Sequence, residues 1–219
     1  MVLVLAIALM VPAHAEPTVS EQIDELRAEI EALKAEVAEL KAQLELLLKS
    51  TSQSGAFMVV QPPQGAPGYS RLNPAPIGTT LTITREGDFG KHTARITLLE
   101  IMRGEQAWNM VRQANPFNRP PKNGYEYLLA KIRFELVAME DPEARLELSP
   151  GHFTAVSAEG EDYDYPLVVA PEPSISAKLY QGAQREGWVV FQIKIGDNPL
   201  ITYGRDFKGK GGIWFKTAK

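Results

Sequence analysis

The sequence has no cysteine among its 219 residues. This absence excludes a disulfide framework, a thiol nucleophile and a metal site built from cysteine ligands. It also leaves no cysteine to accept a lipid, so we expect no lipoprotein anchor. Burial of a hydrophobic core must then stabilise the fold alone, which is compatible with an exported protein.

The sequence also lacks a surplus of basic residues, since its formal net charge is −4. Residues 16–50 carry nine acidic side chains against four basic ones, or −5, so the remainder of the chain sums to +1. Nucleic-acid binding needs a basic face, and neither part has the charge for one. The acidic stretch is equally unsuited to lie on an anionic membrane. We therefore expect no nucleic-acid partner.

Long hydrophobic runs are scarce, and the run Val2–Val11 is about half the roughly 20 residues that a membrane-spanning helix needs. Ala13 and Ala15 then form an A-x-A cleavage signature, which predicts a signal peptide over residues 1–15 and Glu16 as the first mature residue. No Lys or Arg precedes the run, so either the α-amino group acts alone or the chosen start lies too late. The alternative is an uncleaved anchor, the one case in which we expect membrane contact.

The most regular pattern in the chain is an apolar repeat with alternating steps of three and four residues. A period of 3.5 keeps one seam of a helix facing a partner helix and gives a left-handed supercoil. We therefore predict a coiled-coil helix over residues 16–49. The predicted oligomerisation seam consists of Ile23, Leu26, Ile30, Leu33, Val37, Leu40, Leu44 and Leu47.

The residue types of this repeat predict a parallel dimer. Mostly β-branched a positions with leucine at every d position favour two parallel strands. Glu29 and Glu36 fall at g positions and face Lys34 and Lys41 at the following e positions of a parallel partner. No polar residue occupies an a position, so a trimer stays possible. The alternative is a single amphipathic helix folded back on its own domain.

Residues 50–78 combine a Ser-rich segment with five prolines, which predicts a flexible and extended linker. From residue 79 the hydrophobic period changes to two, as in strands with one buried face. Only 105–114 has a helical pattern instead. We predict a mainly β fold for residues 79–219, a single antiparallel β-sandwich. Its expected strands are 79–84, 93–102, 125–138, 152–157, 163–169, 174–180, 187–195, 200–203 and 213–217.

Short runs such as Gly104–Trp108, before the strand 125–138, and Tyr180–Phe191 carry a family resemblance. Together with three other runs they resemble the exported bacterial immunoglobulin-like domains grouped as a domain of unknown function (DUF four-three-five-two type). The resemblance covers roughly residues 75–219 and implies an immunoglobulin-like sandwich in an exported protein. The family has no established catalytic residues to carry over. The regular coiled coil departs from the family's usual short spacer. The similar runs are Gly104–Trp108, Ala114–Asn118, Gly124–Tyr127, Tyr180–Phe191 and Pro199–Tyr203.

Few residues offer catalytic or metal chemistry. His92 and His152 stand far apart in sequence, and His14 falls in the predicted signal peptide. No serine lies in a G-x-S-x-G elbow. The acidic run Glu159–Asp164 has no glycine and no terminal glutamate at the spacing of a calcium-binding EF-hand loop. We therefore expect no catalytic residue, no cofactor, no metal site and no enzymatic activity.

The strongest candidate binding surface combines aromatic, amide and guanidinium side chains around one predicted loop. Loops on rigid β-sandwiches often bind partners, with aromatic and arginine side chains as anchors. In the alternative, Trp108 and Phe117 plug the end of the sandwich while Asn115 and Asn118 cap the helix end. The candidate patch consists of Trp108, Asn109, Arg112, Asn115, Phe117 and Asn118.

These expectations combine into an exported, oligomeric, non-enzymatic binding or structural module, secreted or located in the cell envelope. Its partners would be a second copy of the chain and an unidentified envelope or extracellular ligand, bound with avidity through the stalk. Two alternatives stay open. One is an envelope enzyme or enzyme inhibitor that works from the sandwich loops, and the other is a membrane-tethered spacer with an uncleaved apolar start.

Overall fold

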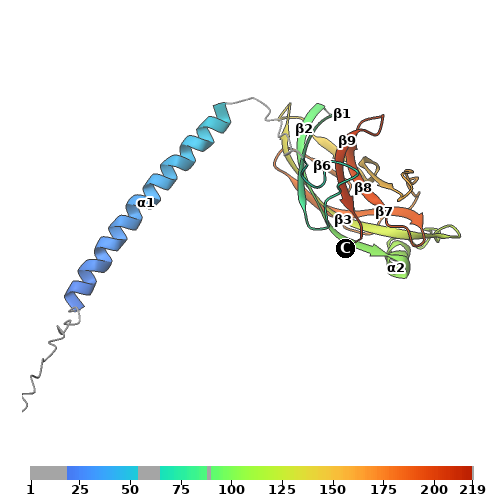
Figure 1. Ribbon diagram of the computed structural model, residues 1–219, viewed down its shortest axis with the longest axis horizontal. Coiled ribbons are helices and arrows are strands. Elements are labelled where there is room, and N and C mark those ends of the chain that lie inside the picture. The colour runs from blue at the N-terminus through green and yellow to red at the C-terminus, as the bar shows by residue number, and fades with distance from the viewer. Residues whose placement is uncertain (1–18, 54–64, 88–89, 219) are drawn as a thin grey trace, which may run out of the picture. The chain divides into compact units, whose positions relative to one another are not determined.

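The chain divides into two compact units, Met1–Ala56 and Phe57–Lys219, which are described here one at a time. Within the described part of the chain, no helix is long and apolar enough to cross a membrane. The computed structural model describes residues 19–53, 65–87 and 90–218, with the side chains of the first helix described from residue 26 to residue 43 (Figure 1).

The first unit contains the helix α1, Val19–Gln53, where the sequence predicts a helix over residues 16–49. Its described seam side chains are all exposed, with exposed fractions between 49% for Val37 and 60% for Leu40. The described part of the seam is therefore not covered by the residues of α1 itself. The predicted signal peptide, residues 1–15, and the side chains of three seam residues lie outside the described part: Ile23, Leu44 and Leu47.

The second unit is mainly β, as predicted, and its strands pair antiparallel. They form a four-stranded sheet in the order β1-β2-β3-β7, a three-stranded sheet in the order β5-β8-β9, and the pair β4-β6. One helix, α2, interrupts the strands (Figure 1). The elements are β1 Thr80–Gly87, β2 Gly90–Arg103, α2 Gly104–Ala114, β3 Tyr125–Met139, β4 Leu146–Leu148, β5 Phe153–Val156, β6 Ala177–Leu179, β7 Gln184–Lys194, β8 Leu200–Arg205 and β9 Gly211–Lys216.

The main core lies between the four-stranded sheet and the other strands. Alternation along β3 turns Leu128, Ile132 and Phe134 into this core, and all three are at most 1% exposed. Phe191 from β7 and Phe215 from β9 belong to the same cluster. Apolar side chains from both sheets thus fill one interior, an arrangement consistent with a β-sandwich.

A second, smaller core lies on the other face of the four-stranded sheet. Leu129 and Tyr127 point outward from β3 yet are buried, because α2 covers them with Ala107 and Val111. The pattern of the sequence predicted a helix over 105–114, and α2 confirms it. β3 is therefore buried on both faces where α2 crosses it.

The last part of the predicted linker, residues 65–78, belongs to the β unit, which corrects the boundary at residue 78. Ala75 is fully buried, its backbone N–H donates to the carbonyl oxygen of Trp214 at 2.8 Å, and its own carbonyl accepts from the N–H of Lys216 at 2.9 Å. The Tyr69 hydroxyl likewise bonds the backbone of Thr82. Extended, proline-rich backbone can lie along an edge strand and bond it at isolated points. The middle of the linker, residues 54–64, lies outside the described part.

The predicted strand 163–169 is wrong, because this segment is irregular. Pro166, Pro171 and Pro173 have no backbone N–H to donate to a sheet, so the apolar alternation here does not make a ladder. The structure instead has the short strand β4, Leu146–Leu148, which the sequence pattern did not predict.

Gly187 is required by close packing inside β7. A Cβ atom at this position would lie 2.4 Å from the backbone of Ser174 and Ile175, which crosses over the strand. The crossing is held by the N–H of Trp188, which donates to the carbonyl oxygen of Pro173 at 2.8 Å. Gly187 thus admits a neighbouring backbone, whereas Gly124, with φ of 80°, serves the turn that leads into β3.

We expect Gly187→Ala to lower the free energy of unfolding by about 1–3 kcal/mol, because the added methyl group must displace backbone rather than a flexible side chain. Gly151→Ala is the matched control, since its Cβ would meet nothing closer than 3.7 Å. Denaturant unfolding of both variants measures the difference. Equal stability of the two variants would contradict this role of Gly187.

A buried histidine links the two larger sheets. His92 of β2 is 3% exposed, and its Nε2 lies 3.1 Å from the hydroxyl of Tyr203 in β8. Burial lowers the pKa of His92, and the nearby positive charge of Arg85 lowers it further. Burial likewise raises the pKa of Tyr203 to about 12. The pair is therefore neutral near pH 7.

Because the pKa of His92 is lower in the folded than in the unfolded chain, its contribution to stability is present above about pH 6.5 and is lost as the pH falls. We expect the free energy of unfolding to drop by up to about 1.4 kcal/mol per pH unit below pH 6.5 from this residue. Denaturant titrations between pH 7.5 and 5.5 measure the slope. An undiminished slope in His92→Gln would contradict the assignment.

Candidate functional site

The helix α2 holds the first part of the predicted binding patch against the outer face of the sheet. Trp108 is half-buried and stacks on Tyr127, with ring centroids 5.9 Å apart and an interplanar angle of 30°. Asn109 is half-buried beside it, and Arg112 is exposed in the last helical turn. Trp108 therefore packs with α2 against the outer face of β3.

The two asparagines of the predicted patch end α2 and join it to a distant loop. The Asn115 Oδ1 accepts from the N–H of Phe117 at 3.0 Å. Asn118 Nδ2 donates to the carbonyl oxygens of Val111 at 2.7 Å and of Val169 at 2.9 Å. The N–H of Val169 donates back to Asn118 Oδ1 at 2.9 Å. Asn118 thus fastens the segment after α2 to the segment before β6.

Phe117 differs from the other predicted residues because its side chain is 91% exposed. It does not plug the sandwich. The segment fastened beside it also exposes large apolar side chains: Tyr165 is 42%, Leu167 is 97% and Val169 is 51% exposed. We name these four residues the apolar rim. Exposed apolar side chains on two segments that hydrogen bonds join are typical of an interaction site.

A groove of about 350 Å³ lies at the apolar rim. One wall comes from the segment after α2, with Arg119, Pro120 and Lys122, and the other from the segment 164–168. The wall after α2 is fixed from below, since the Tyr127 hydroxyl donates to the carbonyl oxygen of Arg119 at 2.9 Å and the N–H of Lys122 donates to Gln192 Oε1 at 3.1 Å. The groove is therefore anchored to β3 and β7.

The apolar rim and the groove were only partly accessible to sequence reasoning. Phe117 stood in the predicted patch, but the second wall lies in the segment 163–169, which the sequence pattern assigned to a strand. The signal available in the sequence was Pro166 beside three large apolar residues, a combination that argues against a ladder strand.

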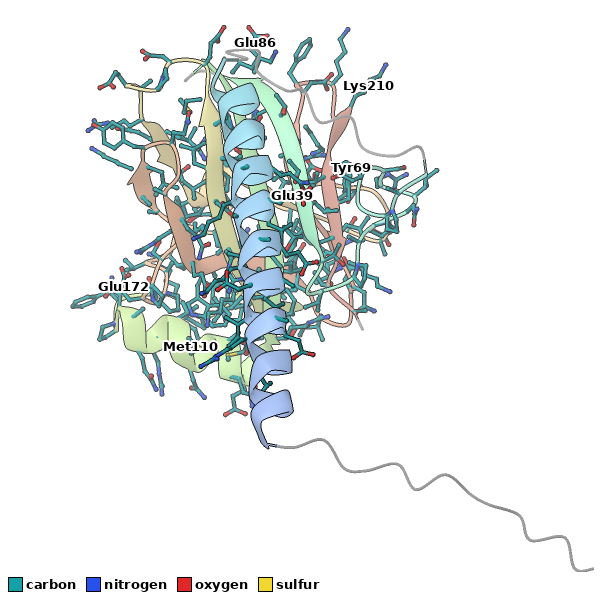
Figure 2. The ribbon with its side chains drawn as sticks, turned by 90° about the vertical axis from the view of Figure 1, so that its left-hand side faces the viewer. Glu39, Tyr69, Glu86, Met110, Glu172 and Lys210 are labelled. Carbon is teal, nitrogen blue, oxygen red and sulfur yellow. The ribbon has the colours of Figure 1, made fainter. Side chains whose placement is uncertain are left out.

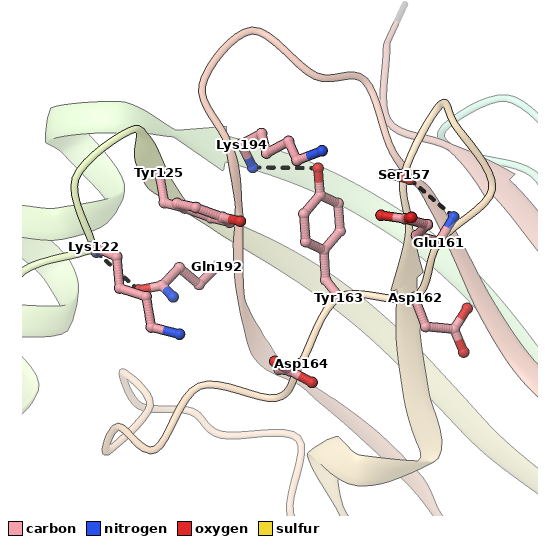
Figure 3. A pocket seen from close by; sticks show the side chains of 9 residues that line it. All are labelled: Lys122, Tyr125, Ser157, Glu161, Asp162, Tyr163, Asp164, Gln192 and Lys194. Atoms are coloured by element: carbon pink, nitrogen blue, oxygen red, sulfur yellow. Dashed lines mark hydrogen bonds between the residues drawn. The ribbon is translucent and has the colours of Figure 1, made fainter.

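A smaller polar hollow of about 130 Å³ adjoins the groove and shares Lys122, Asp164 and Gln192 with it (Figure 3). At its centre, the Tyr163 hydroxyl donates to Asp197 Oδ2 at 2.6 Å and accepts from the N–H of Lys194 at 3.3 Å. Burial, and then the hydrogen bond to Asp197, raise the pKa of Tyr163 to about 12. This phenol therefore stays protonated and does not act as a base near neutral pH.

The acidic loop that lines this hollow is paired in part with cations. Lys194 Nζ lies 3.0 Å from Glu159, and Arg205 makes two bonds to Asp162, at 3.1 and 2.7 Å. Among the residues that the structure describes, no three histidine, aspartate or glutamate side chains are grouped so that they could hold a metal ion. The ion pairs of the acidic loop thus join it to β7 and β8.

Comparison with known proteins identifies no family for this chain. No family model matches it, and no curated protein matches it. Among solved structures, the chain is similar to the secreted protein MPT63 from Mycobacterium tuberculosis, with 13% identity and a TM-score of 0.45, over 70% of this chain and 99% of that chain. It is also similar to the ycdA protein of Bacillus subtilis, with 11% identity and a TM-score of 0.40, over 63% of this chain and 38% of that chain.

Trp108 and Phe117 are expected to behave differently when truncated. Trp108→Ala removes the stacking on Tyr127 and should lower the free energy of unfolding by about 2 kcal/mol, somewhat less than the loss for a fully buried aromatic ring. Phe117→Ala should change it by no more than about 0.5 kcal/mol, because the ring is exposed. Denaturant unfolding compares the two. A large loss in Phe117→Ala would show that its ring packs in the fold.

Proposed function

We propose that this protein is an exported, oligomeric, non-enzymatic binding module, in which a coiled-coil stalk carries β-sandwich domains. The observation that carries the proposal is the bare seam of α1, where Leu26, Ile30 and Leu33 are each at least half exposed in the single chain. An apolar stripe of this length is unfavourable in water, and a helix usually gains its stability by packing such a stripe.

A second copy of the same helix is the partner that fits the seam. The repeat of 3.5 residues continues without a slip from Ile23 to Leu47, which lets two helices stay in contact along their whole length. Leucine at every d position favours a parallel pair. Because no a position of the heptads holds a polar residue, the seam also suits a trimer.

The charges beside the seam support parallel pairing weakly. Lys34, which would face Glu29 of a parallel partner, makes an ion pair with Glu31 of its own helix at 2.8 Å. Both side chains of this pair are about 70% exposed, at 67% and 73%. Exposed pairs contribute only a few tenths of a kcal/mol, so Lys34 can exchange partners at little cost.

We further infer an immunoglobulin-like sandwich of the exported family that the sequence resembles, and a secreted or envelope location. The antiparallel sheets around one core support this fold. The segments that carry the resemblance correspond to α2, the start of β3, β7 and β8. A predicted signal peptide over residues 1–15 supports export.

The stalk gives the module its mechanism. Parallel helices bring the β units of all copies to the same end of the assembly. Two weak sites that are joined in this way bind one surface with far more affinity than either site alone. The binding surface of each unit is the apolar rim with its groove.

The experiment is a comparison of molar mass by light scattering for the full chain and two charge variants. Leu33→Lys with Leu40→Lys places two charges in the seam and should convert the assembly to monomers. Ala35→Lys with Ala42→Lys places the same charges at f positions, which face away from a partner, and should leave the mass unchanged.

A monomeric wild-type chain at micromolar concentration would contradict the proposed stalk. So would equal masses of the two charge variants. The circular dichroism of the seam variant, measured alongside, reports whether loss of mass is accompanied by loss of helix, as expected for a helix that depends on pairing.

A further inference from the structure

We propose that the apolar rim docks the β unit onto an anionic lipid bilayer, with Phe117 and Leu167 entering the acyl boundary. The proposal names the ligand of the binding module inferred above and to that extent rests on it. Sequence reasoning confined membrane contact to an uncleaved apolar start, whereas here the contact is made by two loops of the folded unit.

Two side chains of the rim project from the surface. Phe117 and Leu167 are 91% and 97% exposed, so they project from the surface and do not line a cleft. A protruding apolar side chain needs a partner that deforms around it. The interface of a bilayer is such a partner, since amphipathic elements bury their apolar side chains about 5–10 Å into it.

The backbone beside both projecting side chains is fixed. Asn118 follows Phe117 and exchanges two hydrogen bonds of 2.9 Å with the backbone of Val169. Val168, next to Leu167, packs on the core below α2. The two loops therefore act as one preformed edge, and docking requires little ordering of the chain.

The segment that carries Phe117 is basic. Residues 106–125 contain Arg112, Arg119 and Lys122 and no acidic residue. All three side chains are exposed, and none of them forms an ion pair within the described part of the chain. The opposite wall contributes Asp164 alone to the groove lining. The wall after α2 is therefore basic, which suits phosphate headgroups, whereas the acidic side chains of Glu161 and Asp162 line the adjoining polar hollow.

A protein partner would fit these observations less well. A protein partner would have to supply a matching pocket for each of the two projecting side chains, whereas the interface of a bilayer receives both without one. A peptide partner in the groove is therefore treated as an outcome of the test.

The loop between β8 and β9 offers a matched control. It carries Phe207, which is 94% exposed, together with Lys208 and Lys210, but it exposes a single apolar side chain beside Asp206. Figure 2 shows Lys210 at the end of the β unit opposite Met110 of α2. A flat bilayer that contacts the rim should not reach this loop.

The experiment places a tryptophan reporter in each loop of the full chain. Phe117→Trp and Phe207→Trp are mixed separately with phosphatidylglycerol/phosphatidylcholine vesicles that contain brominated lipid, and the wild-type signal of the three native tryptophans is subtracted. Position 117 should be quenched and shifted to shorter wavelength, and position 207 should not. The readout is local, so binding through the apolar start does not imitate it.

Charge and apolar contributions are separated by further variants. Arg119→Gln with Lys122→Gln should weaken vesicle binding at least about tenfold, from the loss of two cations near an anionic surface. Lys208→Gln with Lys210→Gln should leave binding unchanged. Leu167→Ser should reduce quenching at position 117, and added salt should do the same.

Absence of quenching at position 117 in anionic vesicles would overturn the proposal, as would equal quenching at positions 117 and 207. A change at position 117 caused by a soluble envelope protein or peptide, without any vesicle effect, would overturn it in favour of a protein partner. The seam variant Leu33→Lys with Leu40→Lys should still show quenching at position 117, but only at a higher lipid concentration. Loss of oligomerisation and loss of membrane docking therefore give different results.

Discussion

The architecture of the β unit depends on burial of β3 along both of its faces. Leu128, Ile132 and Phe134 enter the interior between the sheets, while Tyr127 and Leu129 lie beneath α2. Because α2 is packed in this way, the segment after it must leave the sheet at a fixed place. The apolar rim is therefore a consequence of core packing, since its loops are tied to elements that cannot move independently.

The sequence predicted what is local and periodic, and it missed what depends on distant segments. Alternation in β3 and the helical face of α2 were readable because each repeats within a few residues. The role of Gly187 was not, since it arises where the backbone near Ser174 crosses β7. The second wall of the groove was missed for a similar reason: alternation in 163–169 indicates a strand only if neighbouring N–H donors exist, and prolines remove them. Of the four rim residues, the sequence could thus predict Phe117 alone.

The two units differ in how far each buries its own apolar side chains. In the β unit, most large apolar side chains of the strands are buried within the chain, and the rim is a place where four exposed ones lie on two joined segments. In α1, by contrast, the described seam side chains from Leu26 to Leu40 are all exposed. Assembly through the seam and recognition through the rim would together account for both exceptions. The stalk then multiplies whatever affinity one rim has.

The central claim is the parallel pairing of α1, and the absence of cysteine makes it directly measurable. A single cysteine placed at Leu33 lies beside its copy in a parallel, in-register pair, whereas one at Ala35 faces away. Mild oxidation of the two single-cysteine variants should yield a disulfide-linked dimer quickly for Leu33→Cys and slowly for Ala35→Cys. Equal rates at the two positions, or no cross-linking at position 33, would contradict the account.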